Sequence, residues 1–321
     1  MINRNQVRNL QRHFFITSLL LMLATPAWAN NVRATREGAL IKIFGDNAAN
    51  QIVISQNAAR DVIVAGVNGT TVNGLASVRF RNMALNAMDV RMGGGNDIVT
   101  ISNLNVANDL FIDLGAGANR VQTGSAPSTI GANLDIEGGA GNDIVRLLGW
   151  SVFGDLYIDG KLGVLTAEIT NTTIGFNLTV IGDASNDVVS VTGCSVGDST
   201  SIETKGGADR VTVTDFLGYD LFVNTDLGAD MVTLTGVSTL EDVGVYTGTQ
   251  NDTVRFTDVF SGKNIKVSLD AGADSFTGIN VFANYDAVFE GGQVLTRSSI
   301  LESVAARNSK SKSSRSSNEK L

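Results

Sequence analysis

Carboxylate-bearing turns recur along this chain at a nearly constant interval, and their chemistry is the first guide to function. Each turn contains small residues, ends in an acid or amide, and is followed two places later by an apolar residue. The turn positions are 21 to 24 residues apart, at Asp97, Asn119, Asp143, Leu165, Asp187, Asp209, Asp230, Asp252 and Asp274, and Leu165 is the one apolar member. Ca²⁺ prefers carboxylate oxygens as ligands. The aspartates of this column are therefore candidate metal ligands.

A second group of carboxylates follows the same interval. It consists of Asp113, Asp135, Glu137 and Asp159, with Tyr157 beside it. Paired carboxylates can act as acid and base on a glycosidic bond, and they can bind calcium in a lyase. The only histidine is His13, however, and Lys161 is the nearest candidate for a lyase base. The group is interpreted as a solvated acidic stripe, and a polysaccharide-facing patch is the alternative, so the chain is not expected to be an enzyme.

The elements that position these side chains must repeat with the same period. Seven residues before each turn position lies an apolar residue: Val90, Ile112, Ile136, Ile158, Val180, Ile202, Val223, Val245 or Val267. Apolar residues alternate with other residues on both sides of each turn, which indicates strands with one buried face. A looser inward position follows seven residues after the turn, and it includes Cys194, the only cysteine, which is expected to be a buried and inert thiol.

Three short strands per coil predict a coil of triangular section whose equivalents stack into three parallel sheets. The fold class is all-β, a right-handed parallel β-helix (solenoid) with about 22 residues per coil and roughly eleven coils. A further polar column runs through Asp109, Asn133, Asp155, Asn177, Ser199, Asp220, Asp242 and Asn264. Its mixture of acids and amides predicts a hydrogen-bonded ladder at a corner of the coil.

Gly138-Gly139-Ala140-Gly141-Asn142-Asp143-Ile144-Val145 reproduces the GGxGxDxU pattern, and Gly93–Asp97 and Gly206–Asp209 match parts of it. These turns resemble the hemolysin-type calcium-binding repeats of secreted bacterial proteins. The resemblance implies that Ca²⁺ is bound by turn carbonyls and by the aspartate carboxylate. That family repeats every nine residues, whereas this chain has one such turn per 22 residues, so the paired half-sites of the family do not carry over.

The stacking of equivalent aspartates is the physical reason to consider a bound calcium ion. Asp187, Asp209 and Asp230 would lie about 4.8 Å apart, where neighbouring charges repel by roughly 1 kcal/mol in water. Calcium between the carboxylates would offset this repulsion. The other interpretation is that each aspartate accepts hydrogen bonds from the N–H groups of its own turn and extends into solvent.

Threonines form a third kind of column, on the outer face of the strand after the turn. Thr170, Thr192, Thr214, Thr235 and Thr257 are equivalent, and Ser190, Thr212 and Thr233 stand beside them. Paired threonine columns resemble the ice-binding surface of solenoidal antifreeze proteins, so ice binding is a minor alternative. Threonine is also simply favourable in an exposed strand.

The two ends of the chain differ from the repeats. Arg4, Arg8 and Arg12 precede an apolar run, and Ala27-Trp28-Ala29 fits cleavage before Asn30, so residues 1–29 are interpreted as a signal peptide. An N-terminal membrane anchor is the alternative, and no later segment is expected to span a membrane. Residues 30–92 are expected to form a cap and irregular first coils, residues 93–304 the regular coils and a C-terminal cap, and residues 305–321 a disordered, basic, Ser-rich tail.

Composition limits the partners. Without residues 1–29 the chain keeps 21 basic and 32 acidic residues, a net charge of −11. Nucleic acid is therefore not expected, because binding requires a basic surface. The sequence predicts an exported structural, surface or adhesive repeat protein (an adhesin), in the periplasm, at the cell surface or outside the cell, with Ca²⁺ as the only candidate cofactor. A polysaccharide-binding or polysaccharide-degrading β-helix is the alternative, and an extracellular polysaccharide or a cell-envelope component is the expected partner.

Overall fold

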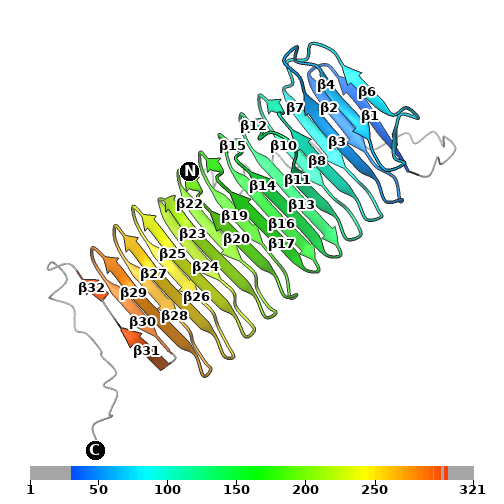
Figure 1. Ribbon diagram of the computed structural model, residues 1–321. Coiled ribbons are helices and arrows are strands. Elements are labelled where there is room, and N and C mark those ends of the chain that lie inside the picture. The colour runs from blue at the N-terminus through cyan, green and yellow to red at the C-terminus, as the bar shows by residue number, and fades with distance from the viewer. Residues whose placement is uncertain (1–29, 292, 298–299, 303–321) are drawn as a thin grey trace, which may run out of the picture.

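The chain winds into a straight rod of stacked β-coils with a cap at its N-terminal end (Figure 1). The computed structural model describes residues 30–291, 293–297 and 300–302, so the expected signal peptide and basic tail lie outside the described residues. The described chain consists of strands and turns, and no helix in it is long and apolar enough to cross a membrane. The fold is a parallel β-solenoid of about 9 turns.

One long sheet, the first sheet, contains the strand that precedes the turn in every coil. Its parallel members are hydrogen-bonded in chain order. They are β2 (Leu40–Phe44), β7 (Ala87–Arg91), β10 (Leu110–Asp113), β13 (Leu134–Ala140), β16 (Leu156–Leu162), β19 (Leu178–Ile181), β22 (Ser199–Glu203), β24 (Asp220–Asn224), β26 (Val243–Tyr246), β28 (Ile265–Ser268) and β30 (Ala287–Glu290).

The second sheet contains the strands that follow the turn, and it bends around a corner within each coil. In the earlier coils a longer strand is followed by one of two residues: β8 (Ile98–Ser102) and β9 (Asn105–Val106), β11 (Arg120–Thr123) and β12 (Thr129–Ile130), β14 (Asp143–Leu148) and β15 (Ser151–Val152), β17 (Leu165–Thr170) and β18 (Thr173–Ile174), β20 (Val188–Thr192) and β21 (Ser195–Val196). In the later coils the two parts merge into β23 (Arg210–Gly218), β25 (Met231–Thr239), β27 (Thr253–Ser261) and β29 (Ser275–Ala283). Two sheets therefore replace the three expected.

The bend in the second sheet has a local cause. Its corner residue adopts a left-handed backbone conformation, with φ between 48° and 71°, at Asn103, Gly149, Asn171, Gly193, Asp215, Gly236, Asp258 and Asn280. Glycine, asparagine and aspartate are the residues that tolerate this conformation. The column of small polar residues therefore turns the strand without breaking the ladder.

The inward columns match the sequence register. Ile136 pairs with Ile112 and with Ile158, Ile158 pairs with Val180, and all four side chains are fully buried. Cys194 is also buried, as expected. One coil cannot enclose its own inner face, so each coil depends on its neighbours for this burial.

Both ends of the stack depart from the regular coil. At the N-terminal end, β1 (Asn31–Glu37) pairs antiparallel with β2 and parallel with β5 (Thr71–Val72). In the second sheet, β3 (Gln51–Gln56) stacks parallel on β8, while β4 (Val62–Gly66) pairs antiparallel with β3 and with β6 (Ser77–Phe80). Residues 30–92 thus combine parallel strands of the stack with antiparallel strands that cap it. At the other end, β31 (Gln293–Arg297) and β32 (Ile300–Glu302) extend the second sheet beyond β29.

Turn glycines permit the close stacking of coils. At Gly228 φ is +148°, and a Cβ there would lie 1.4 Å from the carbonyl oxygen of Gly207 in the preceding coil. Any side chain at this position would push the two turns apart.

We expect Ile158→Ala to destabilise the protein by about 2–5 kcal/mol, because it leaves a cavity between three coils. Thr179→Ala, on the outer face of the neighbouring strand β19, is the matched control and should change stability by less than about 0.5 kcal/mol. The guanidinium midpoint of unfolding measures both effects. Equal midpoints for the two variants would contradict the stacked core.

Candidate functional site

The aspartates of the turns form a continuous hydrogen-bonded column, here called the turn ladder. In it the backbone N–H of one coil donates to the side-chain Oδ1 of the next coil toward the C-terminus. The N···O distances are 2.7 Å from Asn50 to Asp97, 2.8 Å from Asp97 to Asn119, 3.0 Å from Asn119 to Asp143, 2.6 Å from Leu165 to Asp187, 2.7 Å from Asp187 to Asp209, 2.8 Å from Asp209 to Asp230, and 2.9 Å both from Asp230 to Asp252 and from Asp252 to Asp274. The ladder is interrupted only at Leu165, which has no acceptor.

Burial of the turn ladder overturns the interpretation that these aspartates extend into solvent. The exposed fraction of its acids is 2% or less, and the hydrogen bonds to Oδ1 come from the neighbouring coil. The second carboxyl oxygen, Oδ2, is buried without a hydrogen-bond partner in Asp97, Asp143, Asp209, Asp230, Asp252 and Asp274. In Asp187 this atom accepts from the backbone N–H of Asp183 at 3.1 Å.

Burial shifts the protonation of the ladder. Desolvation raises the pKa of Asp97 and Asp209 to about 7, and that of Asp143, Asp187 and Asp252 to about 6, although hydrogen bonds from backbone N–H groups oppose the rise. The pKa of Asp230 is raised for the same reason. A buried carboxylate is costly when ionised, so these groups keep their protons to a higher pH than an exposed aspartate does.

Asn119, the one amide among the turn positions, shows which groups surround the side-chain atom that corresponds to Oδ2 of an aspartate. Its Nδ2 donates to the carbonyl oxygens of Gly115 and Gly117, both at 3.1 Å. The corresponding atom of an aspartate is Oδ2, which can donate to an acceptor only when it carries a proton. The natural asparagine in the ladder thus occupies the same place as a protonated aspartate would.

Threonine hydroxyls flank the later carboxylates. Thr204, Thr225 and Thr247 are fully buried, five residues before Asp209, Asp230 and Asp252. Each hydroxyl lies beside its carboxyl group and lowers the pKa of that group, although none is oriented well enough for a full hydrogen bond. The sequence analysis missed this column, whose signal was a polar residue at an otherwise small or apolar position.

The residues of the turn ladder can be compared with what calcium requires. Ca²⁺ takes six to eight oxygen ligands. In the described part of the chain no three His, Cys, Asp or Glu side chains are grouped so as to hold a metal ion. The unpartnered Oδ2 atoms are the only feature of the ladder that an ion would satisfy, and they are enclosed. Calcium binding stays a prediction, and these residues as placed do not form a calcium cage.

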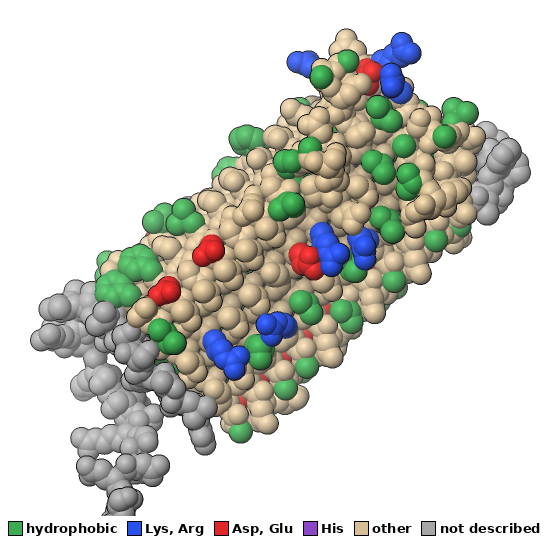
Figure 2. Space-filling view, viewed as in Figure 1, with side chains coloured by type: hydrophobic (Ala, Val, Ile, Leu, Met, Phe, Trp, Pro, Cys, Tyr) green, Lys and Arg blue, Asp and Glu red, His purple; other side chains and the backbone are tan. Residues whose placement is uncertain are grey.

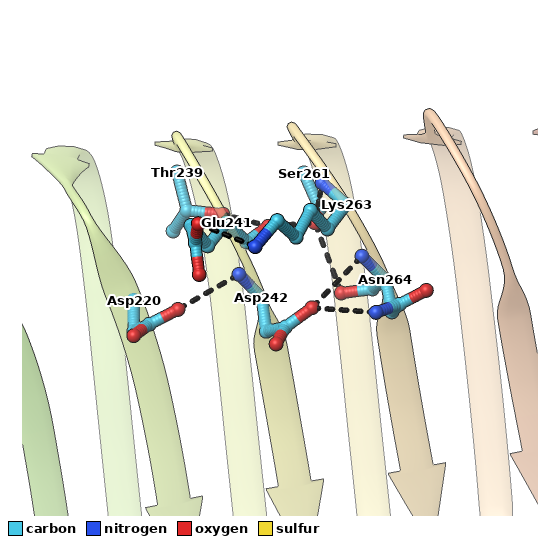
Figure 3. Close-up of polar contacts among 7 residues, drawn as sticks. All are labelled: Asp220, Thr239, Glu241, Asp242, Ser261, Lys263 and Asn264. Carbon is cyan, nitrogen blue, oxygen red and sulfur yellow. Dashed lines mark hydrogen bonds and ion pairs between the residues drawn. The ribbon is translucent and has the colours of Figure 1, made fainter.

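The polar column at the opposite corner confirms the expected hydrogen-bonded ladder, here called the corner ladder. Its direction is reversed: the backbone N–H of Asp242 donates to Asp220 Oδ1 at 2.9 Å, and that of Asn264 donates to Asp242 Oδ1 at 3.0 Å (Figure 3). The Asn264 amide adds a second bond of 2.8 Å to the same oxygen. Asp109, Asn133, Asp155 and Asn177 repeat this arrangement in earlier coils. In the earlier coils acids alternate with amides, and the amide side chain donates to the carboxylate beside it, whereas Asp220 and Asp242 are adjacent acids linked only through a backbone N–H.

The expected acidic group lies on the outer face of the first sheet and is here called the acidic strip (Asp113, Asp135, Glu137 and Asp159). Register pairs Glu137 with Asp113 on one side and with Asp159 on the other. Lys161 bridges two of these acids, with its Nζ 2.8 Å from Asp159 Oδ2 and 3.1 Å from Glu137 Oε1. Lys161 is therefore held as an ion-pair partner.

The two ends of the acidic strip have different protonation. Burial raises the pKa of Asp113, and the negative charge of Glu137 adds to the rise. Burial also raises the pKa of Asp159, but hydrogen bonds and charge from Lys161 outweigh it and leave the pKa below its ordinary value. Two carboxyls with separated pKa values on one face are a property that binding and catalytic sites share.

Aromatic side chains accompany the acidic strip, and the sequence analysis named only one of them. Phe111 and Tyr157 share an outer column with Asp135, one coil to either side of it. The Arg91 guanidinium lies 5.0 Å from the Phe111 ring centroid. Side chains alternate between the two faces of β10, so Phe111 lies on the same outer face as Asp113. This alternation could have identified Phe111 from the sequence.

The threonine columns are also in register. Thr192 pairs with Thr170 and Thr214, and Thr212 pairs with Ser190 and Thr233, on the outer face of the second sheet. Leu148 and Ile279 end the first of these columns. The array is flat and regular, and its register is what the ice-binding alternative requires; its function stays a prediction.

Comparison with protein-family models, with curated proteins and with solved structures found no match for this chain. The function is therefore argued from the geometry of the chain itself.

We expect the melting temperature to fall as the pH rises from 4 to 8. The folded-state pKa values of about 6 to 7 lie above the ordinary value of 3.8. The folded protein thus holds extra protons, and the stability that they contribute is complete below about pH 4 and lost as the pH rises through 6 to 7. Asp209→Asn keeps the Oδ1 acceptor and removes the charge, so it should raise the melting temperature at pH 8 by about 2–4 °C per kcal/mol recovered. At pH 4 it should have little effect.

Asp215→Asn is the matched control, because Asp215 is an exposed acid at the corner of the second sheet in the same coil and its charge does not act on the ladder. It should leave the pH profile unchanged. Repeating the series with millimolar calcium or a chelator separates protonation from metal binding, since a bound ion raises the melting temperature in proportion to its occupancy. A melting temperature that rises with pH only when calcium is present would establish calcium in place of protons.

Proposed function

We propose that this chain is an exported structural rod that serves as a surface or adhesive component. One observation carries the proposal: two hydrogen-bonded ladders run along the coil stack, one at the turns and one at the opposite corner. Such a rod holds its two ends at a fixed separation and presents flat faces between them.

The opposite directions of the two ladders support rigidity. In the turn ladder a side chain accepts from the preceding coil, and in the corner ladder it accepts from the following coil. Sliding one coil over another would break bonds of both kinds. Nearly constant coil length adds to this, because it leaves the faces flat and uninterrupted.

The acidic strip supports a role without catalysis. Lys161 forms ion pairs with both Glu137 and Asp159, and Tyr157 donates a hydrogen bond of 3.1 Å to Asp159. Carboxylates committed to neighbours in this way stabilise a surface. A catalytic pair would have to leave these partners before acting on a substrate.

Deletion of residues 166–187 tests the rod. It removes one whole coil and joins Leu165 to Val188, so both ladders stay in register. We expect a folded protein shortened by about 4.8 Å in small-angle scattering. Deletion of residues 166–176 is the control, and it should unfold the chain because half a coil places the inner face outside. In cells, both the full chain and the one-coil deletion should be recovered outside the cytoplasm with Asn30 as first residue. Recovery in the cytoplasm with residues 1–29 retained would contradict the proposal.

A second candidate function is binding of a polysaccharide along the acidic strip. Phe111 and Tyr157 supply aromatic surface, and the carboxylates beside them accept hydrogen bonds from hydroxyl groups. The strip carries more acids than bases, so neutral or amino sugars suit it better than uronic acids.

We expect Phe111→Ala to weaken binding of a chitosan oligosaccharide by roughly tenfold, because aromatic contacts contribute about 1 kcal/mol or more. Thr179→Ala, in the same outer column beyond Tyr157, is the control. Isothermal titration at fixed salt measures both, with a galacturonate oligosaccharide as the acidic comparison. Equal affinities for wild type and the Phe111 variant would exclude binding at this strip.

A further inference from the structure

Two arginines on the outer face of the second sheet converge on one methionine. Arg210 Nη1 lies 2.8 Å from Met231 Sδ, and Arg255 Nη1 lies 3.8 Å from the same sulfur. Both arginines are exposed and come from strands on either side of β25. Figure 2 shows a pair of basic side chains with a hydrophobic one between them toward the C-terminal end of this face. A thioether is a weak acceptor and cannot replace a carboxylate.

Five other basic side chains of the coils have acidic partners. Carboxylates lie within 4 Å of Arg91, Arg146, Lys161, Lys263 and Lys266. Within the described residues, neither Arg210 nor Arg255 has such a partner. In a chain of net negative charge, two adjacent guanidinium groups without a carboxylate are an exception.

Arg146 makes the contrast direct, because it stands in the same outer column as Arg255. Its neighbour on the next coil is Glu168, and its Nε and Nη2 lie 2.8 and 3.1 Å from the two carboxylate oxygens. Arg255 has Thr233 and Thr277 as its column neighbours instead. On this face Glu168 pairs with Arg146, whereas Arg120, in the column of Arg210, has no carboxylate within 4 Å among the described residues.

The nearest acids along the chain are turned away from the two arginines. Asp209 and Asp252 are buried, and their Oδ1 atoms accept bonds within the turn ladder; the exposed Asp258 accepts a bond from the Asn280 amide. Thr233 and Thr253 share the outer face with the guanidinium groups, in register with Arg255 and Met231 respectively. The surroundings of the pair therefore consist of hydrogen-bonding hydroxyls and one thioether.

We propose that Arg210 and Arg255 form a binding site for an oxyanion, namely sulfate, phosphate or carboxylate. Guanidinium groups bind oxyanions through paired N–H donors, and an anion between them would relieve the repulsion of two like charges. Threonine hydroxyls at the rim would add donors. The strongly acidic rod repels long polyanions, so a single anionic group fits better: either a free ion or one anionic substituent on a saccharide.

Thermal unfolding and isothermal titration of the full mature protein, both at constant ionic strength, test the site. The probes are sodium sulfate, sodium phosphate and galactose 6-sulfate. Galactose is the uncharged comparison. We expect the double variant Arg210→Gln/Arg255→Gln to weaken anion binding by roughly tenfold or more, as for loss of charged hydrogen bonds. Arg146→Gln removes one charge from the same face and should leave binding unchanged. Arg210 and Arg255 are both exposed in the wild-type protein, so the double variant should still fold. Circular dichroism checks its folding.

The outcomes distinguish the sources of the anion. Binding of the inorganic ions alone, lost in the double variant, supports a free-ion site. Tighter binding of galactose 6-sulfate than of sulfate, with no binding of galactose, supports recognition of a substituted saccharide. Equal responses of wild type and the double variant would overturn the proposal, because sulfate also stabilises proteins without a site.

Discussion

Parallel stacking of equivalent residues, one coil directly over the next, is the constraint on which the whole structure depends. At a separation of about 4.8 Å a side chain meets its own equivalent twice, above and below. Apolar residues gain from this arrangement, as the continuous column from Val90 to Val267 shows. Polar residues do not gain automatically, because identical donors or identical charges are brought together. Each polar column of this chain shows a particular solution to that problem.

The two ladders solve it differently. At the corner, amides stand beside most of the acids, so that Asn264 donates twice to Asp242, while the adjacent acids Asp220 and Asp242 are joined through a backbone N–H. At the turns, five successive coils carry aspartate from Asp187 to Asp274, and the backbone N–H of the neighbouring coil supplies one bond to each. In Asp209, Asp230 and Asp252 the second oxygen has no such donor, and burial raises the pKa of these three groups. The turn ladder is therefore specific in register and sensitive to pH, whereas the corner ladder uses amide side chains as additional donors.

The outer faces of the two sheets carry different kinds of side chain. The first sheet carries acids with aromatic rings and one bridging lysine, and the second sheet carries threonines with two arginines that lack acidic partners. Because both faces are flat and belong to one rigid stack, groups on successive coils stay at fixed distances without any loop to hold them. This geometry is well suited to presenting repeated groups and gives little opportunity to enclose a substrate.

The sequence by itself determined the coil period, the inward columns and the corner ladder, because these depend only on the spacing of residue types and on the two-residue alternation of strands. It also brought Asp113, Glu137 and Asp159 to one line. It did not determine that Asp209 and its equivalents are buried, since a turn aspartate looks the same whether its side chain faces solvent or the next coil. The merging of the second and third strands into one sheet depended on the backbone at positions such as Asp215. The pairing of Arg210 with Arg255 required side-chain positions two coils apart. Only the tertiary structure decided these features. Each depends on the direction in which a side chain or the backbone turns, and the spacing of residue types along the sequence does not specify that direction.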